Sequence, residues 1–296
     1  MPILLDRYLQ EQIPQDPGAL PVAFYRDELA ALPGRAGPVH WHPFLELATA
    51  RQGVLDCQVG QTHITLAPGD SILINQNRLH SFRQLSGGEP DPLPILVFSG
   101  TVIAPEDSAA YQKYVRPVLG CSGLPFVVFR GGDARWAGLG LRLRAACRAM
   151  AEQSPYYELE VQRSLSALWQ ILLEHWDALP RAETSPVQLN AQIRLQKMLA
   201  YLYSHYDQNI TLADIAGAAH ISRSEAGRCF RAYLGCSPVE ALIRYRLQAA
   251  RRLLGQTTLT LQQISDACGF HSANYFSRQF RKRYGHSPGE NRRLGK

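Results

Sequence analysis

Four side chains in the first third of the chain have the types and spacing of a metal site or of a polar ligand site. They are His40, His42 and Glu46, in the pattern His-x-His-x3-Glu, followed later by His80. On an extended strand the first three have the same parity and project from one face. If a later strand brings His80 opposite, three imidazoles and one carboxylate converge, and this donor set suits Zn, Fe, Mn or Ni. Pro43 lies inside the motif, where proline disturbs strand geometry.

A second group of residues, near the C-terminus, has the types that read DNA bases. On a helical wheel Phe276 and Phe280 lie about 40° apart and predict a buried stripe. Asn274, Arg278 and Arg281 fall about 140–200° away, on the outer face. Arg forms a bidentate contact to guanine and Asn to adenine in the major groove, so this face is suited to reading DNA.

These residues belong to the second copy of an internal repeat with a period of about 50 residues. Both copies begin with Thr-Leu, carry an Ile four residues after the Thr, contain Phe-Arg and close with Gly-x-Ser-Pro. The matching positions are Thr211 and Thr260, Ile215 and Ile264, Phe230-Arg231 and Phe280-Arg281, and Gly235–Pro238 and Gly285–Pro288. So many aligned positions indicate a duplicated supersecondary unit.

Helix-capping residues predict that each unit is helical. The spacing of an N-cap side chain and its N3 partner recurs at Thr211 with Asp214, Thr260 with Gln263, and Ser222 with Glu225. Gly269 suits a tight turn between two helices, where the backbone needs a positive φ. His220 holds that place in the first copy, less comfortably. A short helix, a tight turn and a longer helix form a helix-turn-helix.

The first copy has a poorer reading face than the second. Ala226 and Phe230 face inward, whereas Gly227 on the outer side has no side chain, and Glu225 beside it repels phosphate. We expect Arg228 to be the main specific contact of this copy. The predicted DNA-binding residues are Ser224, Arg228, Arg231, Asn274, Tyr275, Ser277, Arg278, Arg281 and Lys282.

A helix is also predicted between the two units. Ser237 and Glu240 have capping-box spacing with Pro238 at N1, and the helix then runs to Leu254 before Gly255. Its seventeen residues span roughly 25 Å, which with the flanking turns approaches one DNA turn of about 34 Å. This connector would hold the two reading helices in successive segments of the major groove, on DNA that bends to meet both.

Charge separates the chain into two parts. Residues 186–296 contain 16 Lys and Arg but 6 Asp and Glu, a net charge of +10, and the other 185 residues carry 15 and 19, a net charge of −4. Such asymmetry favours a polyanionic partner for the basic part alone. Hydrophobic residues make up 46% of the chain and charged residues 19%, so the chain is predicted to be globular and not disordered.

The basic part resembles the DNA-binding domain of the AraC/XylS family of bacterial transcription regulators. The resemblance rests on Ile264-Ser-Asp-Ala-Cys-Gly-Phe270, Tyr275-Phe-Ser-Arg-Gln-Phe-Arg281 and Gly285-His-Ser-Pro288. It implies seven helices in about 110 residues, with reading helices at about 222–233 and 272–283. The chain departs from the family pattern at Gly227, where a larger polar reader is common, and at 290–292, where an aromatic residue often precedes the Arg.

The acidic part is predicted to be a small antiparallel β-barrel, because short β-rich runs broken by Gly, Pro and Asn extend from Val39 to about Phe98. Over residues 20–130 it resembles a cupin-like sensing domain. That resemblance implies an organic effector, often a sugar, whose hydroxyls would bond the imidazoles and Glu46 while Trp41 or Phe44 stacks on the ring. We therefore expect no cofactor. Two alternatives remain open: a divalent metal held by His40, His42, Glu46 and His80, and purely structural roles.

Two helices are predicted after the barrel, at about 135–152 and 154–178. In the second, an apolar stripe beside Trp169 and Trp176 suits either the core or a dimer interface, and the family resemblance favours a dimer. The stripe consists of Val161, Leu165, Leu168 and Leu172. The predicted domains are an effector-binding and dimerisation domain over 1–180, a linker over 181–190 and a DNA-binding domain over 191–296. The fold class is therefore α+β with two domains.

The sequence thus predicts a cytoplasmic bacterial regulator, associated with the nucleoid when bound to DNA. The longest apolar stretch, 92–104, is too short for a membrane span, and the N-terminus lacks the layout of a signal peptide. The dispersed cysteines predict reduced thiols. The expected partners are operator DNA, a small-molecule effector, a second copy of the chain and, for an activator, RNA polymerase. The alternatives are a metal-dependent cupin enzyme fused to a DNA-binding domain and a regulator without a ligand.

Overall fold

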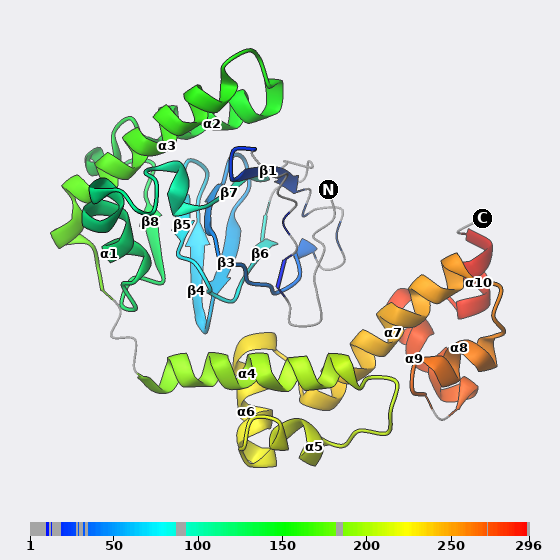
Figure 1. Ribbon diagram of the computed structural model, residues 1–296. Coiled ribbons are helices and arrows are strands. Elements are labelled where there is room, and N and C mark those ends of the chain that lie inside the picture. The colour runs from blue at the N-terminus through cyan, green and yellow to red at the C-terminus, as the bar shows by residue number, and fades with distance from the viewer. Residues whose placement is uncertain are drawn as a thin grey trace. The chain divides into compact units, whose positions relative to one another are not determined.

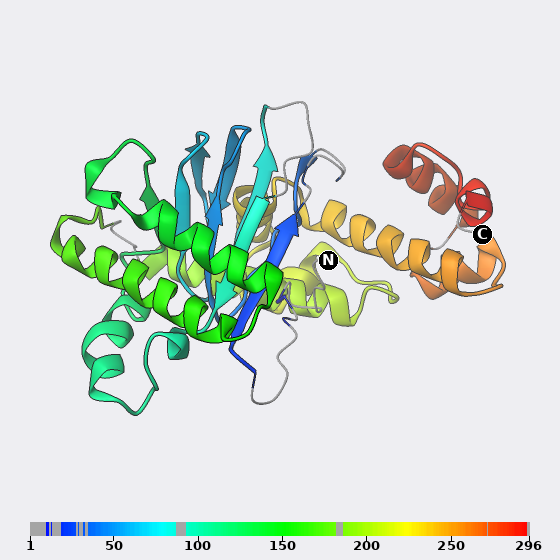
Figure 2. The same ribbon diagram turned by 90° about the horizontal axis from the view of Figure 1, so that it is seen from above.

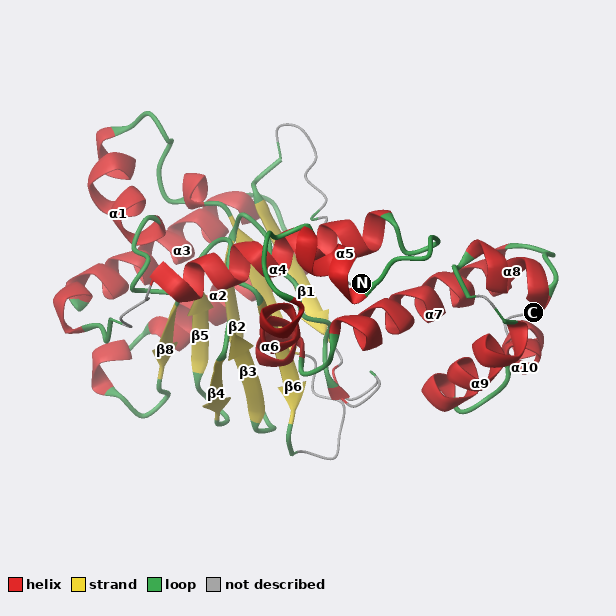
Figure 3. Cartoon of the chain, turned by 90° about the horizontal axis from the view of Figure 1, so that it is seen from below, coloured by secondary structure: helices red, strands yellow, loops and turns green. Residues whose placement is uncertain are grey.

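The chain forms two compact units, Met1–Gln188 and Leu189–Lys296. The computed structural model describes residues 10–11, 13, 19–27, 29, 32, 35–86, 93–181, 186–270 and 272–294. Strands occur in the first unit, whereas the described part of the second unit is built from helices (Figures 1 and 3). This arrangement confirms the predicted fold class.

Two antiparallel sheets form the body of the first unit. Among the described residues, one sheet has the strand order β1-β7-β2-β5-β8 and the other has the order β4-β3-β6. The strands are β1 Val22–Asp27, β2 Leu45–Thr49, β3 Leu55–Val59, β4 Thr62–Leu66, β5 Ser71–Ile74, β6 His80–Gln84, β7 Leu93–Phe98 and β8 Phe126–Phe129. The predicted β-rich runs at 54–59, 63–66 and 71–74 coincide with β3, β4 and β5.

The larger sheet is covered on both faces. One face packs against the smaller sheet around buried Ile72, Ile95 and Cys57. The other face packs against α2 Leu139–Glu152 and α3 Tyr157–Glu174, which lie side by side across it (Figure 2). Because neither face meets water, β5 reads as a continuous apolar run instead of an alternating one.

The apolar stripe of α3 is part of this core. Val161, Leu165, Leu168 and Leu172 are each at most 1% exposed and pack with Trp169 against the sheet and α2. The Trp169 indole also donates a hydrogen bond to the Tyr114 carbonyl, 3.1 Å away. Of the two roles that the sequence left open for this stripe, the structure bears out the core, because the sheet and α2 of the same chain already cover it. Trp176 lies at the edge of the same core, with the Arg181 guanidinium 4.2 Å from its ring centroid.

Short elements connect β7 to α2 in the first unit. They include a 3₁₀ turn at Gly100–Val102, a π-helical segment at Tyr111–Val115 that continues into α1 Arg116–Leu119, and a 3₁₀ turn at Ala134–Trp136. A further 3₁₀ turn at Trp176–Ala178 follows α3. The two helices expected at 135–152 and 154–178 therefore correspond to α2 and α3 with these turns at their ends.

Seven helices lie in residues 186–270 and 272–294, and the first of them, α4, begins in the last residues of the first unit. They are α4 Pro186–Ser204, α5 Leu212–Gly217, α6 Arg223–Leu234, α7 Pro238–Gln256, α8 Leu261–Ala267, α9 Ala273–Tyr284 and α10 Pro288–Leu294. Helix α7 contacts α5 and α6 as well as α8, α9 and α10. It is thus the predicted connector between the two helix-turn-helix motifs.

The predicted capping boxes form at Thr211, Ser237 and Thr260, whose side chains accept hydrogen bonds from the N3 amides. The turn between the short and the long helix has a positive φ in both copies, +55° at His220 and +72° at Gly269. Only glycine adopts this conformation without strain, so the first copy carries a cost that the second avoids.

The boundary between the units differs in detail from the predicted linker. Helix α4 begins at Pro186, within the segment 181–190 that we expected to be linker, and 182–185 lie outside the described residues. All six cysteines are free, and Cys57, Cys229, Cys236 and Cys268 are buried. Across the described part of the chain, no helix combines the length and the apolarity that a membrane span requires.

Candidate metal centre and nucleic-acid interface

Backbone pairing brings the four predicted ligand residues together. His40 and His80 face each other in an antiparallel bridge, with each amide donating to the other's carbonyl at 3.0 and 2.8 Å. Glu46 is the second residue of β2 and pairs with Ile74 and Val97. The expectation that one strand carries the whole motif was wrong, because the chain bends at Pro43 and β2 begins at Leu45.

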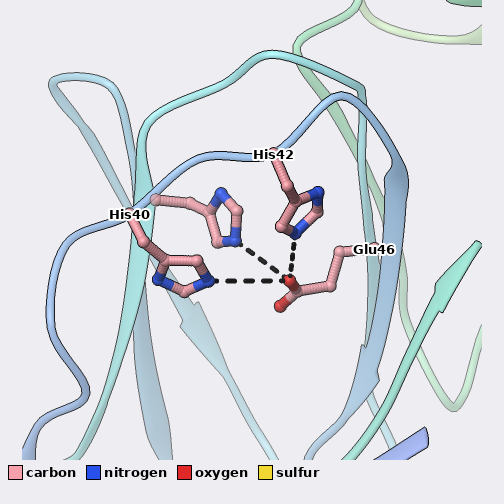
Figure 4. Close-up of side chains that lie close together, drawn as sticks. His40, His42 and Glu46 are labelled. Carbon is pink, nitrogen blue, oxygen red and sulfur yellow. Dashed lines mark hydrogen bonds and ion pairs between the residues drawn. The ribbon is translucent and has the colours of Figure 1, made fainter. Parts of the chain in front are cut away.

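The side chains converge although the backbone does not run straight. One potential ligand atom from each of His40, His42, Glu46 and His80 lies within 4.8 Å of all the others. Glu46 Oε2 is 2.9 Å from His42 Nε2, 3.0 Å from His80 Nε2 and 3.9 Å from His40 Nε2. Figure 4 shows the rings of His40 and His42 turned toward the Glu46 carboxylate. All four residues are at most 4% exposed.

Backbone carbonyls fix which ring nitrogen faces the cluster. The Nδ1 atoms of His40, His42 and His80 lie 2.9, 3.2 and 2.8 Å from the carbonyl oxygens of Pro38, Phe44 and Arg78. A carbonyl oxygen only accepts, so each Nδ1 is the donor. A neutral imidazole has one N–H, and its Nε2 then presents a lone pair to the cluster. This is how proteins orient histidine ligands of metals.

Protonation of the histidines does not give every polar atom of the cluster a partner. Burial, reinforced by the charge of His80, lowers the pKa of His40 to about 3, and burial also lowers the pKa of His42. Burial would lower the pKa of His80 as well, but the Glu46 carboxylate raises it. Burial would likewise raise the pKa of Glu46, yet the charge of His80 and the hydrogen bond from its ring hold it well below its usual range. His80 and Glu46 therefore form an ion pair while the other two rings stay neutral.

A divalent cation fits the donors that remain. A neutral His42 has one ring N–H, which its Nδ1 uses to donate to the Phe44 carbonyl. Its Nε2 is then an acceptor and lies 2.9 Å from a second acceptor, Glu46 Oε2. Glu46 Oε1 is buried and lacks a hydrogen-bond partner among the described residues. Three imidazole nitrogens and a carboxylate are a common donor set for Zn, Fe, Mn or Ni, so His40, His42, Glu46 and His80 would hold such an ion.

The two aromatic residues expected to stack on a sugar do not line the cavity beside the cluster. Trp41 and Phe44 are both half-buried, and the Phe44 ring lies 6.3 Å from that of His42. The cavity has room for about one water molecule, about 10 Å³, within the described part of the chain. Its lining is largely apolar, with Tyr25, Leu29, Phe82, Ile95 and Val97 beside His40 and Glu46.

No sequence pattern indicated that one further residue belongs to this site. Glu11 is 4% exposed, and its Oε2 lies 3.8 Å from His40 Nε2 and 4.0 Å from His42 Nε2. It lies far from the motif along the chain and has no spacing relation to it, so only the folded structure reveals its proximity.

The second helix-turn-helix presents its predicted contacts on α9. Asn274, Arg278, Arg281 and Lys282 are exposed, while Phe276 and Phe280 are fully buried against α7 and α8. Tyr275 and Ser277 are half-buried. Tyr275 packs against Phe270 and lies under the Arg278 guanidinium, 5.5 Å from its ring centroid. Tyr275 thus supports the position of Arg278.

The first helix-turn-helix exposes Ser224, Arg228 and Arg231 on α6, whereas Ala226 and Phe230 are buried. Glu225, which we expected to repel phosphate, is paired with Arg194 of α4. The positive charge of Arg194 offsets that of the carboxylate, so this face repels DNA phosphates less than its sequence implied.

Comparison with known proteins matches one domain model to the region of each site. A cupin domain model matches residues 29–90, which include His40, His42, Glu46 and His80, and a helix-turn-helix domain model matches residues 215–294. The chain is 26% identical over 286 residues to the HTH-type transcriptional regulator YdeC of Bacillus subtilis, covering 96% of each protein. The chain therefore combines a cupin domain with a helix-turn-helix domain, and over nearly its whole length it is similar to a transcription regulator.

Other relatives match most or part of the chain. It is 24% identical over 262 residues to the transcriptional activator RhaS of Pectobacterium carotovorum, covering 86% of this chain and 88% of RhaS. It is 35% identical over 99 residues to CdhR of Pseudomonas aeruginosa, covering 33% of this chain and 30% of CdhR. A solved AraC-type regulator from Chromobacterium violaceum is 32% identical, with 36% of this chain and 96% of that chain covered and a TM-score of 0.35.

Proposed function

We propose that this transcription regulator responds to a divalent transition metal bound by His40, His42, Glu46 and His80. The observation that carries the proposal is the fixed orientation of the three imidazoles, whose Nδ1 atoms are held by carbonyls while their Nε2 atoms converge on Glu46. When bound, the ion supplies the positive charge that these buried lone pairs need. The metal replaces the sugar that we expected, since the neighbouring cavity is small and largely apolar.

The DNA contacts of this proposal lie on α6 and α9. The exposed Arg228 and Arg278 would read bases, and Arg231, Arg281 and Lys282 would contact phosphates. Ser224, Asn274, Tyr275 and Ser277 complete the predicted interface. Exposure on one helix of each motif, together with the net charge of +10 over residues 186–296, supports this assignment.

We further propose that the regulator acts as a homodimer and activates transcription through RNA polymerase. The name of RhaS, a transcriptional activator related over most of its length, supports activation. The dimer would use a surface other than the buried stripe of α3. The metal would act as effector and not as catalyst, because relatives matching nearly the whole chain are named as transcription regulators.

Metal content and DNA affinity, measured on the same preparations, test the metal response. Genome-wide mapping of bound sites first supplies the DNA fragments. We expect the wild type, equilibrated with Zn²⁺, Mn²⁺, Ni²⁺ or anaerobic Fe²⁺, to retain one ion per chain and to change its DNA affinity when a chelator removes that ion. His80→Ala should lose both properties. His63→Ala is the matched control, because this histidine lies in the same domain with a side chain 56% exposed and outside the cluster.

Two outcomes contradict the proposal. A wild-type protein that retains none of these ions has no metal site, and one that retains an ion without any change in DNA affinity does not use it as an effector. If DNA affinity instead changes with an organic compound and not with metal, the earlier interpretation of an organic effector is restored. A metal-dependent reaction that is lost in His80→Ala would favour the enzyme alternative.

A further inference from the structure

A second carboxylate reaches the metal cluster from the N-terminal segment. Glu11 is buried, and its amide donates a hydrogen bond to the Trp41 carbonyl at 2.9 Å. Gln10 forms a parallel bridge with Trp41, so the described residues 10 and 11 run beside the strand-like segment that carries His40 and His42. The backbone thus holds Glu11 alongside the two residues that its carboxylate approaches.

The distances suit two ligands of one ion. Nitrogen and oxygen ligands lie about 2.0–2.2 Å from Zn²⁺, so two of them on the same ion lie at most about 4.4 Å apart. Glu11 Oε2 meets this limit with His40 Nε2 at 3.8 Å and with His42 Nε2 at 4.0 Å. Glu46 Oε2 meets it with the same two atoms at 3.9 and 2.9 Å. Both carboxylates therefore lie within reach of the two imidazoles. Glu11 is not one of the four residues whose ligand atoms all lie within 4.8 Å of one another, so its side chain would move slightly to bind the ion.

The charges also favour a shared cation. A buried carboxylate is costly unless it is paired or binds a metal. Glu46 Oε2 lies 3.0 Å from His80 Nε2, and Glu11 Oε2 lies 3.8 and 4.0 Å from the Nε2 atoms of His40 and His42, so both carboxylates meet the same group of ring nitrogens. When a divalent ion takes the place of the His80 proton, the three imidazoles are neutral and the two carboxylates carry two negative charges, which the ion balances. The motif alone has one carboxylate, so a divalent ion bound only by the motif would leave a net positive charge buried.

We propose that Glu11 is a fifth protein ligand of this metal, so that the ion joins the N-terminal segment to the cupin domain. The inference rests on the metal site proposed above and adds a ligand that the motif does not contain. It also assigns the metal a structural effect, because binding would stabilise the pairing of residues 10 and 11 with Trp41.

Three measurements on the full chain test this ligand. Competition with a chelator gives the Zn²⁺ affinity, the visible absorption of the Co²⁺ form reports the coordination number, and amide exchange at Glu11 reports the bond to Trp41. We expect Glu11→Gln to weaken Zn²⁺ binding by tenfold or more and to intensify the Co²⁺ absorption, as a lower coordination number does. Metal should slow amide exchange at position 11 in the wild type but not in Glu11→Gln.

Controls separate this inference from the proposed function. Glu152→Gln, an exposed residue at the end of α2, should match the wild type in all three measurements. Glu11→Asp retains a carboxylate and should recover part of the affinity, which a merely structural role of the side chain would not predict. If the wild type binds metal and Glu11→Gln binds it equally well with an unchanged Co²⁺ spectrum, Glu11 is not a ligand. If the wild type binds no metal, the proposed function itself fails.

Discussion

Gly269 and His220 occupy the same turn in the two helix-turn-helix motifs, and Gly269→Ala should destabilise the protein whereas His220→Gly should not. In Gly269→Ala the new Cβ would lie 2.5 Å from the Tyr206 carbonyl oxygen and 2.9 Å from Arg246 Nη2. That carbonyl accepts a hydrogen bond from Arg246 Nε at 2.7 Å, and Nη2 donates to Gln208 O at 2.7 Å. The substitution therefore strains the turn and displaces a buried guanidinium from its partners.

The magnitude follows from these contacts. A non-glycine residue in the left-handed region costs about 1–2 kcal/mol, and a hydrogen bond to a charged group contributes about 1.5–3 kcal/mol. The reduced freedom of the unfolded chain returns about 0.4–1 kcal/mol. Gly269→Ala should therefore destabilise the second unit by about 3 kcal/mol, or roughly 10–20 °C in Tm for a domain of this size. His220→Gly removes strain at an exposed position, where φ is +55°, and should be neutral or stabilising by up to about 1 kcal/mol.

Two optical signals distinguish the units in the full-length protein. All four Trp residues (41, 136, 169 and 176) belong to the first unit, so Trp fluorescence reports its unfolding alone. Far-UV circular dichroism reports the helices of both units. We expect Gly269→Ala to lower the Tm of an unfolding transition seen by circular dichroism and to leave the Tm of the fluorescence transition unchanged. The reasoning is refuted if both substitutions shift the helical transition in the same direction, or if Gly269→Ala leaves it unchanged.

Four other substitutions, one of them also combined with a second change, test the assignments on both units. Arg278→Ala should cost about 1–3 kcal/mol of DNA affinity and relax the preference at one base position, whereas Arg281→Ala should weaken all sites alike and flatten the salt dependence. A changed base preference in Arg281→Ala, measured on a panel of operator variants, would mean that the face assignment is wrong. Arg194→Ala should weaken binding to all DNA up to several-fold, because it leaves Glu225 unpaired on α6, and adding Glu225→Ala should reverse the loss. Burial would raise the pKa of Asp70, but the Gly131 amide and the Arg130 guanidinium hold it below its usual 3.8. Asp70→Asn should therefore cost about 1–3 kcal/mol of unfolding free energy near neutral pH. Urea titrations should show this difference disappearing as the pH falls below about 3.8, since a depressed carboxyl pKa stabilises only above the titration of the unfolded state.

The sequence alone determined the helical architecture of the second unit. The N-cap residues Thr211, Ser237 and Thr260 act on amides three residues away, and the buried stripe of Phe276 and Phe280 follows from the helical period. Both signals depend on residues close together in the sequence, so they can be recognised without knowledge of the fold. The repeat predicted that the unit contains two helix-turn-helix motifs, because two copies of one sequence pattern are expected to fold alike.

Only the tertiary structure decided what each apolar stripe covers and which polar groups meet. The period of Val161 and Leu165 indicated a buried face on α3, but not whether the sheet or a second copy buries it. The histidine motif suggested ligands, yet their convergence depends on the bend at Pro43 and on the pairing of His40 with His80. Glu11 reaches the same cluster from a distant segment through backbone bonds to Trp41. Such contacts depend on long-range packing, which brings together residues whose spacing along the chain carries no information about it.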